Sequence, residues 1–148
     1  MQVAQAYLEQ LKEKRRSIWI AGDFGQVARY TAKEAEAFVE RLENRSTARL
    51  LDVACGTGNL AIPAARAGAT VTGVEIAPNL LDQARERRRR EGLTATFDEG
   101  DAEQLLYPDG KLDVVMPMFG AMFAPRPERV AAELIRVCKL GGKIAMAN

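Results

Sequence analysis

The chain has 148 residues, of which 47% are hydrophobic and 28% charged, and its formal net charge is +1. These values fit one globular domain with a sizeable core, and the small net charge provides no overall field that would select nucleic acid. No apolar run approaches the roughly 18 residues of a membrane-spanning helix, and the N-terminal stretch lacks the basic-then-apolar order of a secretory signal. We therefore expect a cytoplasmic protein with neither a membrane nor a nucleic acid as its partner.

The sequence contains no histidine and two cysteines, Cys55 and Cys138. The absence of histidine excludes Ser-His-Asp triads, Cys-His pairs and histidine general bases. Two cysteines do not make a disulfide framework, and with no histidine or second cysteine near either one we expect no metal site. Chemistry must therefore rest on a reactive cofactor, carboxylates, a tyrosine or positioning alone, and no catalytic residue can be assigned.

Residues 1–47 are predicted to form an N-terminal helical segment. The first stretch has apolar residues at helical spacing, and the glycines of AGDFG at 21–25 indicate a break. A second helical pattern then begins at Thr31, with Glu34 three residues later in the spacing of a capping box.

From residue 48 onwards, strand patterns alternate with helix patterns. This alternation predicts a Rossmann-like α/β fold, a doubly wound and mostly parallel sheet covered by helices on both faces. Ligands bind such sheets at the carboxyl ends of the strands, here beside the first strand. The expected strands are 49–54, 70–75, 94–100, 111–118 and 143–147, and the expected helices are 59–67, 78–90 and 127–138.

A glycine turn, CGTG at 55–58, follows the first predicted strand. Gly56 and Gly58 allow a sharp turn and a close approach to a ligand, and the next helix points its N-terminus at that ligand. No lysine follows, which excludes the P-loop. The spacing Gly56-x-Gly58-x-x-Ala61 fits the dinucleotide fingerprint, and Glu75 lies where an acid would bind ribose hydroxyls. These residues alone do not separate a nicotinamide cofactor from another adenosyl ligand.

Three further features favour an adenosyl ligand with a positive charge. Asp52, inside the first strand, could face an ammonium group. Asp101, after the third strand, could accept a hydrogen bond from an adenine amino group. The fourth strand leads into MPMFGAMFAPRP at 116–127, an apolar and aromatic wall that suits a sulfonium or a methyl group.

Five segments in order resemble the successive motifs of class I S-adenosylmethionine-dependent methyltransferases, in the style of the ubiquinone/menaquinone-biosynthesis group. They are LDVACGTGNLA, VTGVEIAPNLLDQAR, FDEGDAEQL, LDVVMPMFG and LIRVCKLGGKIAM. The resemblance covers residues 48–148. It implies S-adenosylmethionine as cofactor, S-adenosylhomocysteine as product, and direct displacement of the methyl group onto a small molecule, with the enzyme supplying proximity and orientation.

The resemblance also implies contacts with the cofactor. Glu75 would bind both ribose hydroxyls and Ile76 would pack on the adenine. The residues that would hold the methionyl part are Asp52, Ala54, Cys55, Gly56 and Gly58, with Cys55 acting through its main-chain N–H.

Other implied contacts come from three separate segments. Asp101 and Ala102 would read the adenine edge, and the carbonyl of Met116 would accept a hydrogen bond from the cofactor's amino group. The stretch GDFGQVARY resembles a lid over the cofactor, in which Phe24 and Tyr30 are the candidate contacts.

Simpler interpretations of these residues remain open. The turn could connect strand and helix without a ligand, Glu75 could be a solvated strand end, and Asp101 could cap a helix, with Gln104 in capping-box spacing. The basic run that includes Arg87–Arg90 is predicted to be a solvated helix end rather than a nucleic-acid site.

The chain supplies five of the seven strands that the resemblance implies, without the last helix and strands six and seven. An uncovered fifth strand would expose unpaired backbone and apolar side chains. Either the chain is truncated, or a second copy covers this edge in a homodimer. We expect two parts, a helical lid at 1–47 and a cofactor-binding core at 48–148.

Two alternatives to a methyltransferase follow. A chain that lacks its substrate half could be a non-catalytic cofactor-binding remnant or scaffold. A nicotinamide-dependent oxidoreductase would need a proton donor such as Tyr-x-x-x-Lys, whereas Tyr30 and Lys33 are only three residues apart.

Overall fold

Five strands form one sheet in the computed structural model, which describes residues 2–42 and 46–147. The spatial order is β3-β2-β1-β4-β5, and every neighbouring pair is parallel. This confirms the predicted doubly wound α/β fold, with a fully rather than mostly parallel sheet. The strands are β1 (Arg49–Val53), β2 (Thr70–Glu75), β3 (Ala95–Glu99), β4 (Leu112–Pro117) and β5 (Cys138–Ile144).

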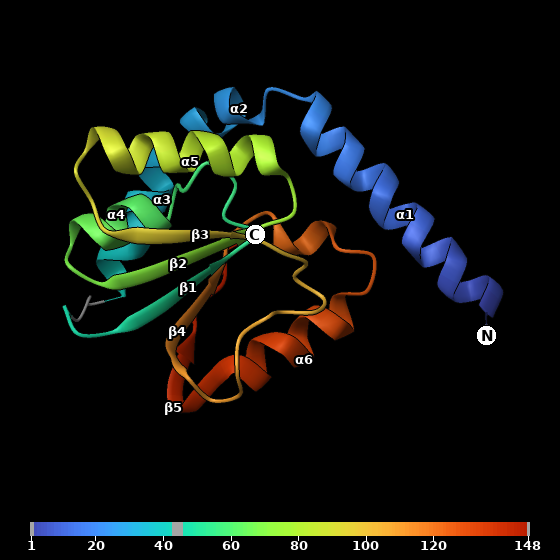
Figure 1. The fold of residues 1–148 in the computed structure, drawn as a ribbon. Coiled ribbons are helices and arrows are strands. Elements are labelled where there is room, and N and C mark those ends of the chain that lie inside the picture. The colour runs from blue at the N-terminus through green and yellow to red at the C-terminus, as the bar shows by residue number, and fades with distance from the viewer. Residues whose placement is uncertain (1, 43–45, 148) are drawn as a thin grey trace.

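The strand order reverses between β1 and β4. The chain moves from β1 to β2 and β3 on one side, then returns to place β4 and β5 on the other (Figure 1). The loops that leave β1 and β4 therefore diverge at their carboxyl ends, which opens a crevice between them. The predicted position of the switch point, beside the first strand, is confirmed.

Helices cover both faces of the sheet (Figure 1). Helices α3, α4 and α5 pack on one face, and α6 packs on the other. The helices are α1 (Gln2–Ala21), α2 (Phe24–Tyr30), α3 (Ala32–Arg41), α4 (Ala61–Arg66), α5 (Pro78–Arg90) and α6 (Pro127–Val137), with a short 3₁₀ turn at Ala121–Phe123.

Strand β1 shows how the two faces are divided. Leu50 joins the cluster under α3, α4 and α5, whereas Leu51 and Val53 join the cluster under α6. Side chains alternate along a strand, so Asp52 faces the same side as Leu50, where its carboxylate meets the first residue of α4. The alternation thus places one carboxyl group inside an otherwise apolar layer.

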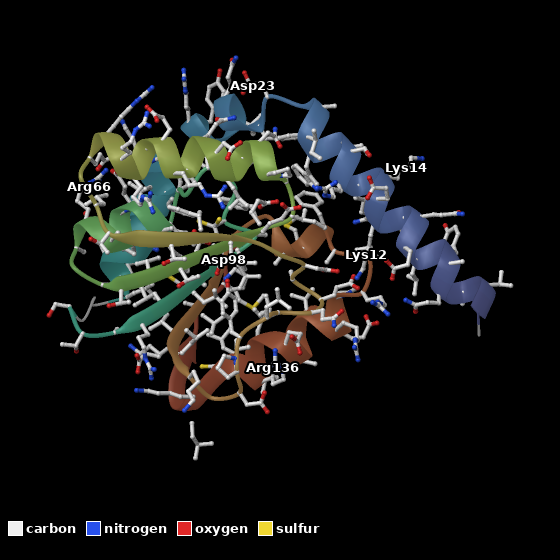
Figure 2. All side chains as sticks on the ribbon, in the orientation of Figure 1. Lys12, Lys14, Asp23, Arg66, Asp98 and Arg136 are labelled. Atoms are coloured by element: carbon white, nitrogen blue, oxygen red, sulfur yellow. The ribbon has the colours of Figure 1, made fainter. Side chains whose placement is uncertain are left out.

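Helix α1 crosses the carboxyl edge of the sheet, and its N-terminal turns extend away from the rest of the molecule (Figure 1). Lys12 points from α1 towards the sheet, and Lys14 points away from it (Figure 2). Helix α2 begins after Asp23, whose side chain accepts a hydrogen bond from the Gln26 N–H. The expected cap at Thr31 is wrong in detail, because its hydroxyl donates to the Ala28 carbonyl instead of capping α3. Residues 43–45, at the end of the predicted segment, lie outside the described residues.

Strand β5 begins five residues earlier than predicted, at residue 138 rather than 143. The Gly141-Gly142 pair does not end α6; it lies in a bulge between the pairs Leu112–Cys138 and Val114–Lys143. Gly141 has φ +75°, and a Cβ on Gly142 would lie 2.9 Å from the Asp113 carbonyl oxygen. Glycine is needed here because the backbone of β5 folds tightly against β4.

The outer edge of β5 pairs with no other strand among the described residues. Leu140 is fully exposed, and Ile144 and Met146 are also exposed. The predicted open edge is present in this part of the chain, and the homodimer that would cover it stays a prediction.

Candidate functional site

The turn after β1 holds the main chain in an unusual conformation. Ala54, Gly56 and Gly58 have φ values of +57°, +52° and +84°, the left-handed region that non-glycine residues rarely adopt. Cys55 extends the sheet, because its N–H donates to the Val74 carbonyl at 3.0 Å. A non-glycine residue in this region stores strain that the surrounding structure must hold. The turn is therefore a rigid, preformed element at the carboxyl end of β1.

Glu75 ends β2 and organises this turn. Its Oε2 accepts a hydrogen bond from the Gly56 N–H at 3.0 Å, and its Oε1 accepts from the N–H groups of Ile76 and Ala77 at 2.9 and 3.1 Å. Only 7% of the residue is exposed, so the interpretation of Glu75 as a solvated strand end is wrong. Burial raises its pKa, while the three N–H donors act in the opposite direction.

Asp52 is a second buried carboxyl group, with 2% of its surface exposed. Its Oδ2 accepts a hydrogen bond from the Ala61 N–H, at the start of α4, at 3.0 Å. Burial raises the pKa of Asp52 to about 8; the Ala61 N–H opposes this rise, and the nearby charge of Glu75 adds to it. No cation pairs with Asp52 within the described part of the chain, so a cationic ligand would supply a missing partner.

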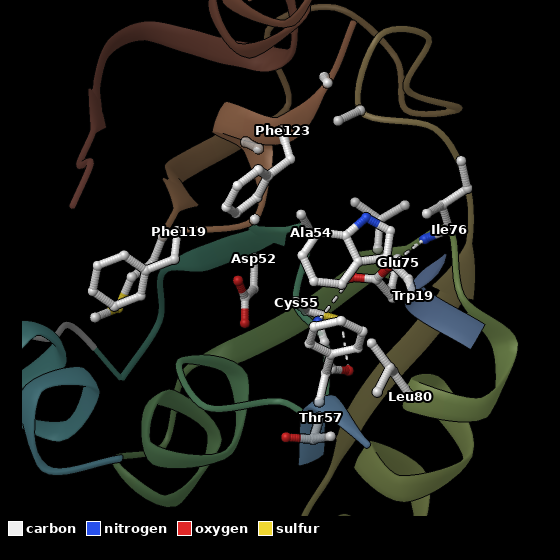
Figure 3. A pocket seen from close by; sticks show the side chains of 18 of the residues that line it. Trp19, Asp52, Ala54, Cys55, Thr57, Glu75, Ile76, Leu80, Phe119 and Phe123 are labelled. Carbon is white, nitrogen blue, oxygen red and sulfur yellow. Dashed lines mark hydrogen bonds between the residues drawn. The ribbon is translucent and has the colours of Figure 1, made fainter. Parts of the chain in front are cut away.

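A cavity of about 430 Å³ lies at the carboxyl ends of the strands. Figure 3 shows Asp52, Glu75 and the ring of Trp19 around the same space. The predicted site residues that line it are Phe24, Asp52, Ala54, Cys55, Gly56, Glu75, Ile76, Asp101 and Ala102.

Three predicted site residues do not line this cavity. Gly58 turns inward, where a Cβ would lie 3.1 Å from the Ile62 side chain. Met116 is fully buried in β4 beside Asp52. Tyr30 is 86% exposed at the end of α2. Of the two predicted lid contacts, only Phe24 therefore reaches the cavity.

Asp101 follows β3 and is already paired. Its Oδ1 accepts from the Glu103 N–H at 2.8 Å, and its Oδ2 lies 2.5 Å from the Lys12 ammonium of α1. Residues 101–104 form a turn rather than a helix, so the helix-cap alternative for Asp101 is wrong. The carboxylate stabilises the turn and at the same time anchors α1.

The segment after β4 approaches the glycine turn very closely. Phe119 has φ +58°, and a Cβ on Gly120 would lie 2.6 Å from the Ala54 Cβ and 2.9 Å from the Ala54 carbonyl oxygen. Only glycine fits at this position. The two loops that diverge from β1 and β4 therefore touch at the base of the crevice.

The comparison with known proteins decides the family. A family model described as a methyltransferase domain matches residues 51–146. The chain belongs to this family. The matched residues include every segment that surrounds the cavity from the sheet side.

Similar proteins include named methyltransferases. An uncharacterized protein of Mycobacterium tuberculosis is 42% identical over 134 residues, 90% of this chain and 49% of the relative. A phosphatidylethanolamine N-methyltransferase from Cereibacter sphaeroides is 35% identical over 127 residues, 84% of this chain and 60% of the relative. The solved structure of the [4+2]-cyclase SpnF superposes with a TM-score of 0.70 at 32% identity, covering 75% of this chain and 42% of that one.

The methyltransferase chain spans about half the length of the first curated relatives that it matches. Within this half, the structure describes no helix long and apolar enough to cross a membrane. Nor does the described part contain a cluster of three or more Asp, Glu or Cys side chains that could hold a metal ion.

The methyltransferase family implies S-adenosylmethionine, and the donor set fits this molecule. Asp52 lines the cavity, pairs with no cation of residues 2–42 and 46–147, and would complement an ammonium or sulfonium group. Glu75 would face ribose hydroxyls, and the apolar side chains of Ile76 and Leu80 also line the cavity. The predicted contact of Asp101 with the adenine edge agrees less well with the structure, because the Asp101 carboxylate is paired with Lys12.

Cys55 has the structural role that its sequence context predicts. The residue is 6% exposed, and burial raises the pKa of its thiol well above the usual value. It therefore stays protonated and is a poor nucleophile, which leaves its main chain as the functional part.

Sequence reasoning missed the three cations that α1 contributes to this cavity. Lys12, Arg15, Arg16 and Trp19 all line the cavity from this helix. Arg16 donates to the Ile76 carbonyl at 3.1 Å and to Glu99 at 2.9 Å. The signal was present in the sequence, because positions 12, 15, 16 and 19 share one face of a helix.

Aromatic side chains join α1 to both sides of the cavity mouth. The ring of Trp19 lies 4.4 Å from that of Phe24 and 5.3 Å from that of Phe123, measured between centroids. Phe24 belongs to α2 and Phe123 to the segment after β4. Side chains of α1 and α2 therefore form one rim of the cavity together, and their role as a lid stays a prediction.

Arg87 was also missed. It was assigned to a solvated helix end, yet its Nη1 donates to the Thr57 carbonyl at 2.8 Å and to the Asn59 Oδ1 at 2.9 Å. The Asn59 side-chain amide then donates to the Ala28 carbonyl at 2.6 Å. Burial lowers the pKa of Arg87. This chain of hydrogen bonds ties α5, the glycine turn and α2 together.

The predicted solvent exposure of the basic run holds for Arg85, Arg89 and Arg90, but not for Arg87 and Arg88. Arg89 and Arg90 pair with Glu86 and stay largely exposed. Arg85 and Arg88 instead turn back onto β3, where they donate to the carbonyls of Phe97 and Ala95.

Proposed function

We propose that this protein transfers the methyl group of S-adenosylmethionine to a small-molecule acceptor by direct displacement. The observation that carries the proposal is the placement of two buried carboxyl groups, Asp52 and Glu75, on either side of the glycine turn and in the wall of one cavity. Membership in the methyltransferase family and the named N-methyltransferase relative support it.

The bound cofactor would supply an activated methyl group on a sulfonium. The protein's residues do the rest by binding and orientation, which convert a bimolecular step into one within the complex. Glu75 holds the turn through the Gly56 N–H, and the N–H groups of Ile76 and Ala77 fix the position of its carboxylate for hydroxyl donors. Asp52 offers a carboxylate whose ionised form a neighbouring cation would favour.

The lid residues would exclude water from the reacting atoms. Trp19 and Phe24 would lie over the cofactor, and Phe123, in the apolar segment after β4, would lie beside the acceptor. Closing an active site in this way strengthens the electrostatic interactions inside it. No residue of this site is assigned as a general base, which direct displacement from a sulfonium does not require.

Isothermal titration with S-adenosylhomocysteine, with NADH as the control ligand, tests the cofactor. We expect micromolar binding of S-adenosylhomocysteine and none of NADH. Glu75→Ala should abolish the binding, whereas Glu34→Gln, an exposed carboxylate on α3, should not change it. Binding of NADH, or of neither ligand, would contradict the proposal.

Turnover separates an enzyme from a cofactor-binding remnant. Phosphatidylethanolamine, named in one relative, is the first acceptor to test, with transfer of a labelled methyl group as the measurement. Cofactor binding without transfer to any member of an acceptor panel would favour the remnant.

A further inference from the structure

We propose that Arg15 recognises an anionic group, a carboxylate or a phosphate ester, on an otherwise apolar acceptor. The inference rests on the proposed function, because that function defines one end of the cavity as the acceptor end. It adds a substrate class and a specificity-determining residue.

Three cations line the cavity from α1. Lys12 lies 2.5 Å from Asp101 and 2.9 Å from Glu103, so two carboxylates neutralise it. Arg16 pairs with Glu99 at 2.9 Å. Both positive charges are therefore balanced within the protein and are not available to a ligand.

Arg15 differs from these two cations. Its side chain forms no ion pair within residues 2–42 and 46–147. The one hydrogen bond of this side chain there runs from Nη1 to the main-chain carbonyl of Phe123. A guanidinium group carries five N–H donors in a planar fork that matches carboxylate and phosphate oxygens. Arg15 therefore keeps both an unbalanced charge and free donors at the cavity wall.

The surface next to Arg15 is apolar. The wall segment, residues 118–125, follows β4 and contains no ionisable side chain. Most of its residues line the cavity, and the Trp19 ring packs against Phe123 within it. An acceptor placed here would meet aromatic and aliphatic surface together with one unpaired cation. An apolar body with an anionic group satisfies both, whereas a cationic acceptor would be repelled by Arg15.

Two fluorescent probes of matched shape test this directly. 1-Anilinonaphthalene-8-sulfonate carries an anionic group, and N-phenyl-1-naphthylamine has the same rings without it. Trp19 is the only tryptophan in the sequence and lines the cavity, so energy transfer from Trp19 measures the affinity for either probe. The Arg15 variants then show whether the probe binds beside this residue. Arg15→Gln should weaken binding of the sulfonate about tenfold, the scale of one hydrogen bond to a charged group, and leave the neutral probe unchanged.

Lys14→Gln is the matched control. It removes the same charge from the same helix, but Lys14 is exposed and points away from the sheet (Figure 2). We expect it to change neither probe. Arg15→Lys keeps the charge and should retain most of the sulfonate binding, which separates recognition from a general disturbance of α1. Equal losses for both probes, or no loss in Arg15→Gln, would overturn the proposal.

Displacement of the sulfonate probe then defines the anion. Octanoate and octyl phosphate should compete, and the stronger competitor identifies the preferred class; stronger competition by octylamine would overturn the proposal. The S-adenosylhomocysteine titration on the unmodified protein keeps the two claims apart. Cofactor binding without discrimination between the probes refutes only the role of Arg15, whereas discrimination without cofactor binding refutes only the proposed function.

Discussion

Replacing Asp52 with asparagine should remove most of a pH dependence of stability that this residue creates. Its pKa is about 8 in the folded protein, against about 3.9 for an unperturbed aspartate. The folded state therefore binds the proton more tightly than the unfolded state does. This contribution to stability is fully present below about pH 4 and is lost as the pH rises through 8.

The size of the effect follows from the linkage between protons and folding. Between these two pKa values, the free energy of unfolding falls by about 1.4 kcal/mol for each pH unit gained. Between pH 5 and pH 7, Asp52 alone would thus lower the free energy of unfolding by up to about 3 kcal/mol. Asparagine has the same shape and can still accept the hydrogen bond from Ala61, but it does not titrate.

Urea denaturation at pH 5, 6, 7 and 8, followed by circular dichroism, measures this difference. Asp52→Asn should gain stability relative to the unmodified protein as the pH rises. Asp82→Asn is the control, because the Asp82 side chain is 74% exposed on α5. A stability difference between Asp52→Asn and the unmodified protein that stays constant from pH 5 to pH 8 would refute the reasoning.

Three further variants test other parts of the site. Glu75→Gln should lower the free energy of unfolding by about 2 kcal/mol in urea denaturation, because an amide cannot accept all three main-chain N–H groups and must direct its own NH₂ at one of them. Arg87→Met should weaken S-adenosylhomocysteine binding about tenfold in calorimetry, because a hydrogen bond to a charged group is lost and the Asn59 amide is released. Gly120→Ala should lower both the melting temperature and cofactor affinity, because its Cβ would overlap that of Ala54; an unchanged melting curve would mean that the two loops can separate freely. If Arg87→Met bound S-adenosylhomocysteine as tightly as the unmodified protein does, the turn would hold its shape without the arginine.

The grouping of Asp52, Glu75 and the glycine turn around one cavity could be predicted because its signals are local. A strand, a glycine turn and a helix follow one another in the sequence, and the spacing from Gly56 to Glu75 reflects one helical crossover between adjacent parallel strands. The structure adds a physical reason for this spacing, because the Glu75 carboxylate accepts a hydrogen bond from the Gly56 N–H. Tyr30 rested on a resemblance alone, and the structure places it away from the cavity.

The start of β5 could not be predicted, because two glycines after a helix pattern are the usual sign of a helix end. Here the two glycines form a β-bulge instead. Only the close approach of the Gly142 backbone to β4 in the folded protein shows this. The role of Arg87 was hidden for a similar reason. A run of arginines at a helix end indicates solvent exposure, and nothing in the sequence shows that one of them meets the carbonyl of Thr57.

The acceptor side depends on where α1 docks, and Glu103 explains why that docking is specific. Glu103 is 1% exposed, and a buried carboxylate is costly unless cations and N–H groups satisfy it. Its carboxylate pairs with the Lys12 ammonium of α1 at 2.9 Å. It also pairs with the guanidinium of Arg126, the residue just before α6, at 2.7 Å. Although burial raises the pKa of Glu103, the hydrogen bonds from Lys12 and Arg126 hold it below its usual value.

The buried carboxylate of Glu103 thus joins α1 to the end of the wall segment at residues 118–125. Without α1 in this position, Glu103 would lose one of its two cations, and the anchor of the wall segment would weaken. The position of α1 and the shape of the wall segment are therefore coupled, through Glu103 and through the direct contacts of Arg15 and Trp19 with Phe123. This coupling also fixes the position of Arg15, which lies on α1 between the anchored Lys12 and the stacked Trp19.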